Sequence, residues 1–207
     1  MNSKLAVKQL KAIEKLNLKR DGVMEMRLAA QWPEEYQMLI ATILSAQTRD
    51  EVTIEVCDVL FLKYPTMKDL AEASVEDVRK IISKVNYSPT KSGRIIETAK
   101  MVIGGGGVIP KTTEELMKFP GIGRKVANVY LSEAHKLDKI GVDTHVARIS
   151  MKLRWTELTD PNKIEKDLER LFPRKYWKGL NETLVRFGKS YGLSRKYEDE
   201  VLGKLIN

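Results

Sequence analysis

The sequence predicts an all-α fold, on three observations. Apolar residues recur at three- and four-residue intervals in nearly every segment, which is the pattern of a helix that buries one face. The sequence contains no sustained alternation of apolar and polar residues of the kind that marks a half-buried strand. Prolines and capping residues divide the chain into pieces of helical length. At 207 residues, the chain is long enough for one domain or for two small lobes.

The clearest helical patterns lie in the first third of the chain. One apolar face is formed by Tyr36, Leu39, Ile40, Ile43 and Leu44. A second face follows the segment SAQTRD and is formed by Val52, Val56, Val59 and Leu60. Thr48 and Glu51 have the spacing of a capping box, in which the two side chains bond the free amides at a helix start. We therefore expect Thr48 to begin the second of these helices.

The glycine run GGGGVIP, residues 104–110, separates this region from the next helix. It is no phosphate loop, because no strand precedes it and no Gly-Lys-Ser or Gly-Lys-Thr follows it. We expect a flexible connection. Thr112 and Glu115 then have the capping-box spacing, and the helix that they begin should end before Pro120.

Composition narrows the class of protein. The chain has 36 basic and 28 acidic residues, a net charge of +8 and a pI near 9.4, which fits a polyanionic partner or simply a solvated basic surface. No apolar run approaches the roughly 18 residues of a membrane span, and the N-terminal segment is unlike a secretory signal, so we expect a cytoplasmic protein. Cys57 is the only cysteine, so the chain can form no internal disulfide, no zinc-thiolate cluster and no four-thiolate iron-sulfur site. We expect no metal and no cofactor.

The segment FPGIGRKVANVYL, residues 119–131, predicts a tight hairpin between two helices. Gly121 and Gly123 can adopt positive φ and lack Cβ atoms, so a phosphate could approach the main chain and the free amides of the next helix. Arg124 directly after the turn adds positive charge. The alternative is a steric turn with no ligand, and the hairpin alone does not decide between them.

Lys125 and Asp143 are the candidate catalytic pair. A lysine amine is a nucleophile once it loses its proton, and the positive end of a helix beside Arg124 favours that loss. Asp143 lies 18 positions later, at the start of the next apolar helical pattern. Its ordinary role there is an N-cap, and His145 is expected to be structural. A lysine facing a carboxylate suits attack on a sugar C1′, where positive charge develops as the base leaves.

Together, these segments resemble the endonuclease III branch of the helix-hairpin-helix DNA glycosylases. The resemblance rests on FPGIGRKVANVYL, on GVDTH at residues 141–145 and on YQMLIATILSAQTRD at residues 36–50, and it covers roughly residues 30–155. It implies an enzyme that flips a damaged base out of duplex DNA, cuts the glycosidic bond and nicks the strand. Lys125 then corresponds to the Schiff-base lysine and Asp143 to the catalytic aspartate.

The resemblance assigns further residues to DNA. Gln47 would fill the gap left by the flipped nucleotide, although without the family it would be taken for a polar loop residue. In KVNYSPTKSGRI, residues 84–95, relatives usually show a glycine, a bulky wedge residue and an aromatic, where this chain has Asn86, Tyr87 and Ser88. Tyr87 would be the wedge, and Lys91 is predicted to contact DNA.

The C-terminal segment departs from the family. Many relatives carry four cysteines that hold an iron-sulfur cluster, whereas this chain has Gly192 at the first of these positions and no cysteine beyond it. A variant without the cluster is therefore expected. Lys189, Arg195 and Lys196 could contact phosphate or form a solvated basic face.

The resemblance also implies an architecture of two helical lobes with a DNA-binding cleft between them. Residues 26–137 would form a helical barrel that ends in the hairpin, and residues 1–25 would join residues 138–207 in the second lobe. Lys125 and Asp143 would line opposite walls of the cleft. The partner would be double-stranded DNA with damaged bases or abasic sites, bound by a monomer.

Two other functions remain open on the sequence. A monofunctional mismatch or uracil glycosylase fits the altered loop at residues 86–88, but such relatives commonly lack the lysine. A non-catalytic DNA-binding module could use the hairpin alone. Lys125 and Asp143 together favour the bifunctional enzyme, and oxidised pyrimidines such as thymine glycol are its expected substrates.

Overall fold

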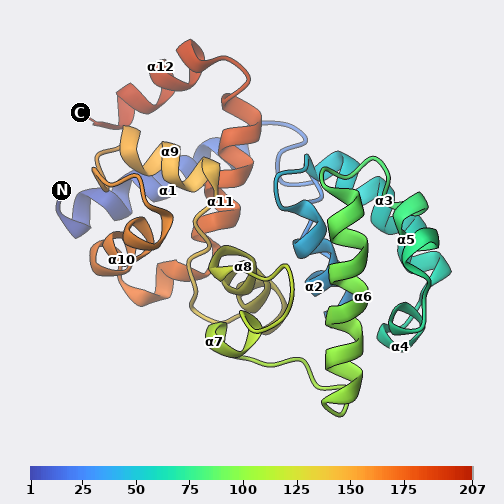
Figure 1. Ribbon diagram of the computed structural model, residues 1–207. Coiled ribbons are helices and arrows are strands. Elements are labelled where there is room, and N and C mark those ends of the chain that lie inside the picture. The colour runs from blue at the N-terminus through green and yellow to red at the C-terminus, as the bar shows by residue number, and fades with distance from the viewer. Residues whose placement is uncertain (207) are drawn as a thin grey trace. The chain divides into compact units, whose positions relative to one another are not determined.

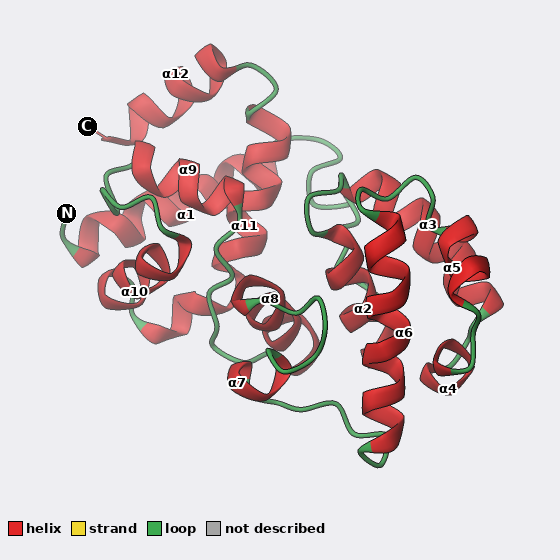
Figure 2. Ribbon diagram, viewed as in Figure 1, coloured by secondary structure: helices red, strands yellow, loops and turns green. Residues whose placement is uncertain are grey.

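A computed structural model describes residues 1–206 and consists of helices joined by loops (Figures 1 and 2). The α-helices are α1 (Ser3–Lys19), α2 (Glu35–Ser45), α3 (Asp50–Lys63), α4 (Met67–Ala71), α5 (Val75–Ile81), α6 (Ser88–Gly104), α7 (Thr113–Leu116), α8 (Arg124–His135), α9 (Thr144–Lys152), α10 (Pro161–Leu171), α11 (Trp177–Tyr191) and α12 (Arg195–Ile206), and the 3₁₀ helix η1 (Arg174–Tyr176) precedes α11. No strand occurs among the described residues, so the all-α prediction is confirmed.

The chain forms two units, each with its own apolar core. The first unit joins Met1–Met26 to the chain from Lys136 onward, and the second is the segment Arg27–His135. Within residues 1–206, no helix combines the length and the apolar character that crossing a membrane requires.

In the first unit, α1 packs against α11 and α12, which come from the other end of the sequence (Figure 1). Buried polar side chains of α1 fix this pairing. Gln9 Nε2 donates to the carbonyl of Leu205 at 3.0 Å, and Gln9 Oε1 accepts from the indole N–H of Trp155 at 2.7 Å. Asn17 Nδ2 donates to the carbonyl of Thr183 at 3.0 Å. The two termini therefore build one core, because each of these bonds has a specific partner far away in the sequence.

The second unit, Arg27–His135, packs α2 to α8 around a separate core, with α6 against α2, α4 and α5 and with α2 against α8. Tyr130, fully buried on α8, donates its hydroxyl hydrogen bond to Glu35 of α2 at 2.6 Å. His135 Nε2 lies 3.0 Å from the same carboxylate oxygen. Cys57 is also buried in this core, as expected.

The two predicted capping boxes have different outcomes. Thr112 caps α7 as predicted, because its hydroxyl accepts from the amide of Glu115 at 3.3 Å. The prediction for Thr48 is wrong: α3 begins at Asp50, with Arg49 as its N-cap. The Thr48 hydroxyl instead accepts from the amide of Asn86 and from the ammonium of Lys91, both at 3.3 Å. The Thr48 hydroxyl therefore bonds residues that are distant in the sequence in place of the amide of Glu51, the partner that a capping box would give it.

Gly188 and Gly203 allow a matched test of packing in the first unit. A Cβ at Gly188 of α11 would lie 2.1 Å from Nδ1 of His145, whereas a Cβ at Gly203 of α12 would meet no described atom within 4 Å. Gly188→Ala should therefore lower the free energy of unfolding by about 1–3 kcal/mol through overpacking. Gly203→Ala should raise it by about 0.5–1 kcal/mol, because alanine favours the helix. Chemical denaturation measures both, and equal effects would contradict the described packing.

Candidate functional site

The two glycines of the hairpin between α7 and α8 have different roles. Gly121 adopts φ +86°, and a Cβ there would lie 3.2 Å from Arg94 Cδ and 3.3 Å from Ile43 Cγ2, so a glycine is needed at this position. Gly123 does not have the positive φ that the sequence suggested. Its carbonyl accepts the first hydrogen bond of α8, from Ala127 at 3.0 Å, and none of the described atoms would lie within 4 Å of a Cβ at Gly123. The backbone at Gly123 is therefore open to approach.

Two hydrogen bonds join the hairpin to its surroundings. The buried hydroxyl of Thr113 on α7 donates to Oδ1 of Asn128 on α8 at 2.9 Å. The hydroxyl of Thr98 on α6 donates to the carbonyl of Pro120 at 3.2 Å. Together they fix where α8 begins, and therefore the position of Arg124 and Lys125 in its first turn.

Lys125 is half-buried and lies in a region of positive charge. Burial, together with the positive charges of Arg94 and Lys125, lowers the pKa of the neighbouring Lys91 to about 8. Arg94 and Lys125 therefore each lie within electrostatic reach of Lys91. Because the amides at a helix start also carry partial positive charge, the start of α8 is suited to an anion.

Lys91 itself is not placed to contact DNA as the sequence predicted. Its side chain is 6% exposed, and its ammonium donates to the carbonyls of Leu44 at 2.7 Å and Ala46 at 2.5 Å. The sequence carried a signal for this burial: Lys91 shares one helix face with Ile95, Thr98, Ala99 and Val102, all of which are buried.

Gln47 and Tyr87, predicted as DNA contacts from separate segments, lie on two loops that are bonded to each other. Both have positive φ, +56° for Gln47 and +60° for Tyr87. Asn86 Nδ2 donates to the carbonyl of Gln47, and the amide of Asn86 donates to the hydroxyl of Thr48 at 3.3 Å. Gln47 is exposed and the Tyr87 side chain is 64% exposed. One unit thus holds Gln47, Tyr87 and the hairpin with Lys125.

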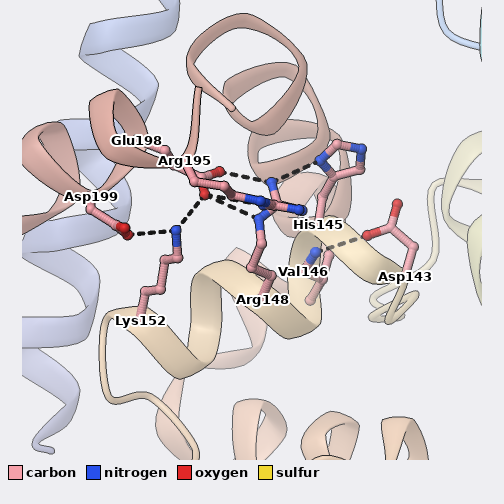
Figure 3. Close-up of polar contacts among 8 residues, drawn as sticks. All are labelled: Asp143, His145, Val146, Arg148, Lys152, Arg195, Glu198 and Asp199. Carbon is pink, nitrogen blue, oxygen red and sulfur yellow. Dashed lines mark hydrogen bonds and ion pairs between the residues drawn. The ribbon is translucent and has the colours of Figure 1, made fainter. Parts of the chain in front are cut away.

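Asp143 belongs to the other unit, where it is the N-cap of α9 as predicted. Its Oδ1 accepts from the amide of Val146 at 2.8 Å (Figure 3). The side chain is partly exposed. The cap therefore fixes the direction of a carboxylate that still reaches solvent.

C-terminal to Asp143, charged side chains join α9 to α12 (Figure 3). Arg148 contacts Nδ1 of His145 at 3.3 Å and donates from Nη2 and Nε to the two oxygens of Glu198 at 2.7 and 3.1 Å. Lys152 donates to Glu198 at 2.7 Å, and Arg195 lies 3.5 Å from the same oxygen. This places His145 in a structural network, as the sequence suggested, and gives Arg195 an acidic partner.

Glu198 is a buried carboxylate at the centre of these contacts, with 0% exposure. Burial alone would raise the pKa of its carboxyl, but the hydrogen bonds and positive charges of Arg148 and Lys152 prevail and lower that pKa to about 2. Sequence reasoning missed Glu198, because an acidic residue in a charged C-terminal helix gives no sign of burial. Lys189, near the end of α11, and Lys196, in the first turn of α12, reach the surface of the same unit.

The residues of this region do not fit an iron-sulfur cluster. Four thiolates hold such a cluster, and the chain contains one cysteine, Cys57, which is buried in the other unit. A Cβ at Gly192 would lie 2.2 Å from the carbonyl oxygen of Gly188 and 3.0 Å from Oε1 of Glu198. Side-chain space at Gly192 is therefore occupied by the backbone of α11 and by the charged network.

Comparisons with known proteins show which proteins the chain is similar to. Residues 40–174 match the family described as the HhH-GPD superfamily base excision DNA repair protein. The chain is 38% identical to endonuclease III of Thermotoga maritima over 75% of this chain and 74% of that protein, and 33% identical to endonuclease III of Synechocystis sp. over 93% and 89%. It is also similar to the structure of a trapped endonuclease III–DNA covalent intermediate, with a TM-score of 0.85 and 28% identity over 94% of this chain and 90% of that one.

The low pKa of Glu198 predicts acid lability of the network. Glu198 gains its partners only in the folded protein, so the stability it contributes is complete above its unfolded pKa near 4.5 and is lost as the pH falls towards about 2. By linkage this amounts to roughly 3 kcal/mol. Free energies of unfolding measured between pH 6 and pH 2 should converge for wild type and Glu198→Gln. The exposed control Glu200→Gln should follow wild type, and parallel curves for wild type and Glu198→Gln would refute the assignment.

Proposed function

Because the chain belongs to the HhH-GPD superfamily of base excision DNA repair proteins, we propose that it is a DNA glycosylase with lyase activity at abasic sites. The observation that carries this proposal is Lys125 in the first turn of α8, directly after the glycine hairpin and beside Lys91 and Arg94. A neutral lysine amine at this position can act as a nucleophile towards a sugar bound at the hairpin.

In the proposed reaction, Lys125 Nζ attacks the sugar C1′ as the bond from C1′ to the damaged base breaks. The base leaves with the bonding electron pair and is protonated. Opening of the sugar ring gives a Schiff base between Lys125 and C1′. Loss of a proton from C2′ then breaks the C3′–O bond, which nicks the strand. Hydrolysis of the Schiff base finally frees the enzyme. Asp143 stabilises the positive charge that develops at C1′ or accepts a proton.

The proposed DNA contacts follow from the backbone and the charge. Phosphate would lie against the amides at the start of α8, where Gly121 forms the turn, Gly123 leaves the backbone open to approach and Arg124 adds positive charge. Such contacts do not read sequence, so the enzyme can examine any duplex. Lys189 and Lys196 are proposed as further phosphate contacts in the other unit. Gln47 and Tyr87 are proposed to occupy the space that an extruded nucleotide leaves.

The proposed partner is duplex DNA that carries an oxidised pyrimidine or an abasic site, bound by a monomer in the cytoplasm, at the nucleoid. A monofunctional glycosylase is the second candidate, and the substitution of residues 86–88 favours it because that loop lies beside Gln47. The two differ in one respect: only the bifunctional enzyme forms a covalent intermediate through Lys125.

Borohydride trapping tests the role of Lys125. Reduction of the Schiff base should give a stable enzyme–DNA adduct with wild type and none with Lys125→Gln, because the reduced bond joins C1′ to Lys125 Nζ. Lys118→Gln, which alters an exposed lysine of the same hairpin, is the control and should trap as wild type does. Asp143→Asn should slow base release by about 10²–10⁴-fold. Wild-type trapping and nicking by Lys125→Gln would disprove this mechanism.

A panel of duplexes tests the substrate. Thymine glycol and abasic sites should be cleaved without alkali, because the lyase step nicks the strand, whereas uracil, a G·T mismatch and 8-oxoguanine should remain uncleaved. Base release that leaves the strand intact until alkali is added would instead support the monofunctional enzyme. Salt-dependent binding with no base release from any duplex would support a DNA-binding module.

A further inference from the structure

We propose that Lys91 is a positioning residue for Gln47: its buried ammonium, together with Asn86, holds the segment that follows α2 in the conformation that presents the Gln47 side chain. The inference rests on the proposed function, because Gln47 matters only if the protein binds DNA with an extruded nucleotide. It replaces a direct contact between Lys91 and DNA with an indirect role.

The ammonium of Lys91 is fully used by this segment. It has three N–H donors, and three acceptors surround it: the carbonyls of Leu44 at 2.7 Å and Ala46 at 2.5 Å and the hydroxyl of Thr48 at 3.3 Å. Because α2 ends at Ser45, the carbonyls at its C-terminal end lack helical partners and carry partial negative charge. The buried ammonium supplies both the missing hydrogen-bond donors and the opposite charge. All three of its N–H groups are then used, so none remains to donate to a phosphate.

Asn86 also binds the segment that follows α2. Its side-chain amide donates to the carbonyl of Gln47, and its backbone amide donates to the hydroxyl of Thr48 at 3.3 Å. Gln47 itself sits at φ +56°, a region that a residue with a Cβ rarely adopts. Such a conformation persists only where the surroundings determine it, and here Lys91 and Asn86 supply those surroundings.

A rigid loop matters for a side chain that must fill a gap in DNA. Extruding a nucleotide is costly, and a side chain already held in place stabilises the open state without a further loss of conformational freedom. Tyr87 is the N-cap of α6, and the amide of Lys91 makes the usual backbone hydrogen bond of a helix start to its carbonyl at 2.9 Å. Lys91 therefore lies one helical turn from Tyr87, while its ammonium bonds the segment of Gln47.

The experiment is a double-mutant cycle on DNA binding. Dissociation constants are measured, over a range of salt concentrations, for a duplex with a tetrahydrofuran abasic-site analogue and for the matching undamaged duplex. Lys91→Met and Gln47→Ala should each lower the preference for the abasic duplex by about tenfold, and the double variant should lower it no further. Lys84→Met, which removes an exposed lysine paired with Glu55, is the matched control for lost charge and should keep the wild-type preference.

Salt dependence separates positioning from a phosphate contact. If Lys91 positions Gln47, the slope of log K against log salt stays at the wild-type value in Lys91→Met. A slope that falls by about 0.9, with equal loss of affinity for both duplexes, would mean that Lys91 binds phosphate and would overturn the inference. Independent, multiplicative losses in the double variant would overturn it as well.

Two further measurements keep the test decisive. If Lys91→Met does not fold, Asn86→Ala changes an exposed residue with the same role and should show the same lack of additivity with Gln47→Ala. Borohydride trapping by wild type is recorded in parallel. Trapping by wild type combined with a wild-type preference in Lys91→Met or Asn86→Ala would overturn the inference alone. Absence of trapping with the coupling intact would instead refute the proposed lyase activity and leave standing the inference, which needs only DNA binding with an extruded nucleotide.

Discussion

Burial of the Lys91 ammonium beside the positive charges of Arg94 and Lys125 is the constraint on which this part of the structure depends. Like charges brought together in a partly buried place destabilise a folded protein unless something offsets them. For Lys91 the offset is internal, because its ammonium donates hydrogen bonds to the carbonyls of Leu44 and Ala46 at the end of α2. An approaching phosphate can supply the offset for the others at the start of α8. The positive charges that help to lower the pKa of Lys91 are therefore the same charges that, in the proposed function, lie near a polyanion.

The features that could be predicted from the sequence depend on neighbours along the chain. The PGIG turn, the start of α8 at Arg124 and the Asp143 cap each follow from residues within about four positions of one another. The Thr48 cap failed because its hydroxyl bonds Asn86 and Lys91, some forty positions away. Burial of Glu198 was likewise beyond prediction, since its partners lie on α9 and no local pattern marks them. Lys91 is the intermediate case, because its helix face indicated burial but not its partners.

In the first unit, the charged network around Glu198 joins α12 to α9. Charged side chains therefore hold α12 in place, rather than cysteines that bind a cluster. Removing a cationic partner of a buried carboxylate strongly destabilises the folded protein, because it leaves a buried charge without compensation. The network also requires small residues nearby, and Gly188 and Gly192 leave the space that His145, Arg148 and Glu198 occupy. Because α9 carries Asp143 at its first turn, the network supports the helix on which the candidate carboxylate is mounted. A link of this kind responds to acid rather than to oxidants or chelators.

Backbone strain gives an independent reason to regard the loops of Gln47 and Tyr87 as functional. Four described residues other than glycine have positive φ, and two of them are Gln47 and Tyr87. Each such conformation costs about 1–2 kcal/mol. A glycine would remove that cost, so the retained side chains must contribute something that glycine lacks. Both side chains are exposed, and neither is needed to fill a core. In the proposed function, that contribution is the contact of both side chains with DNA.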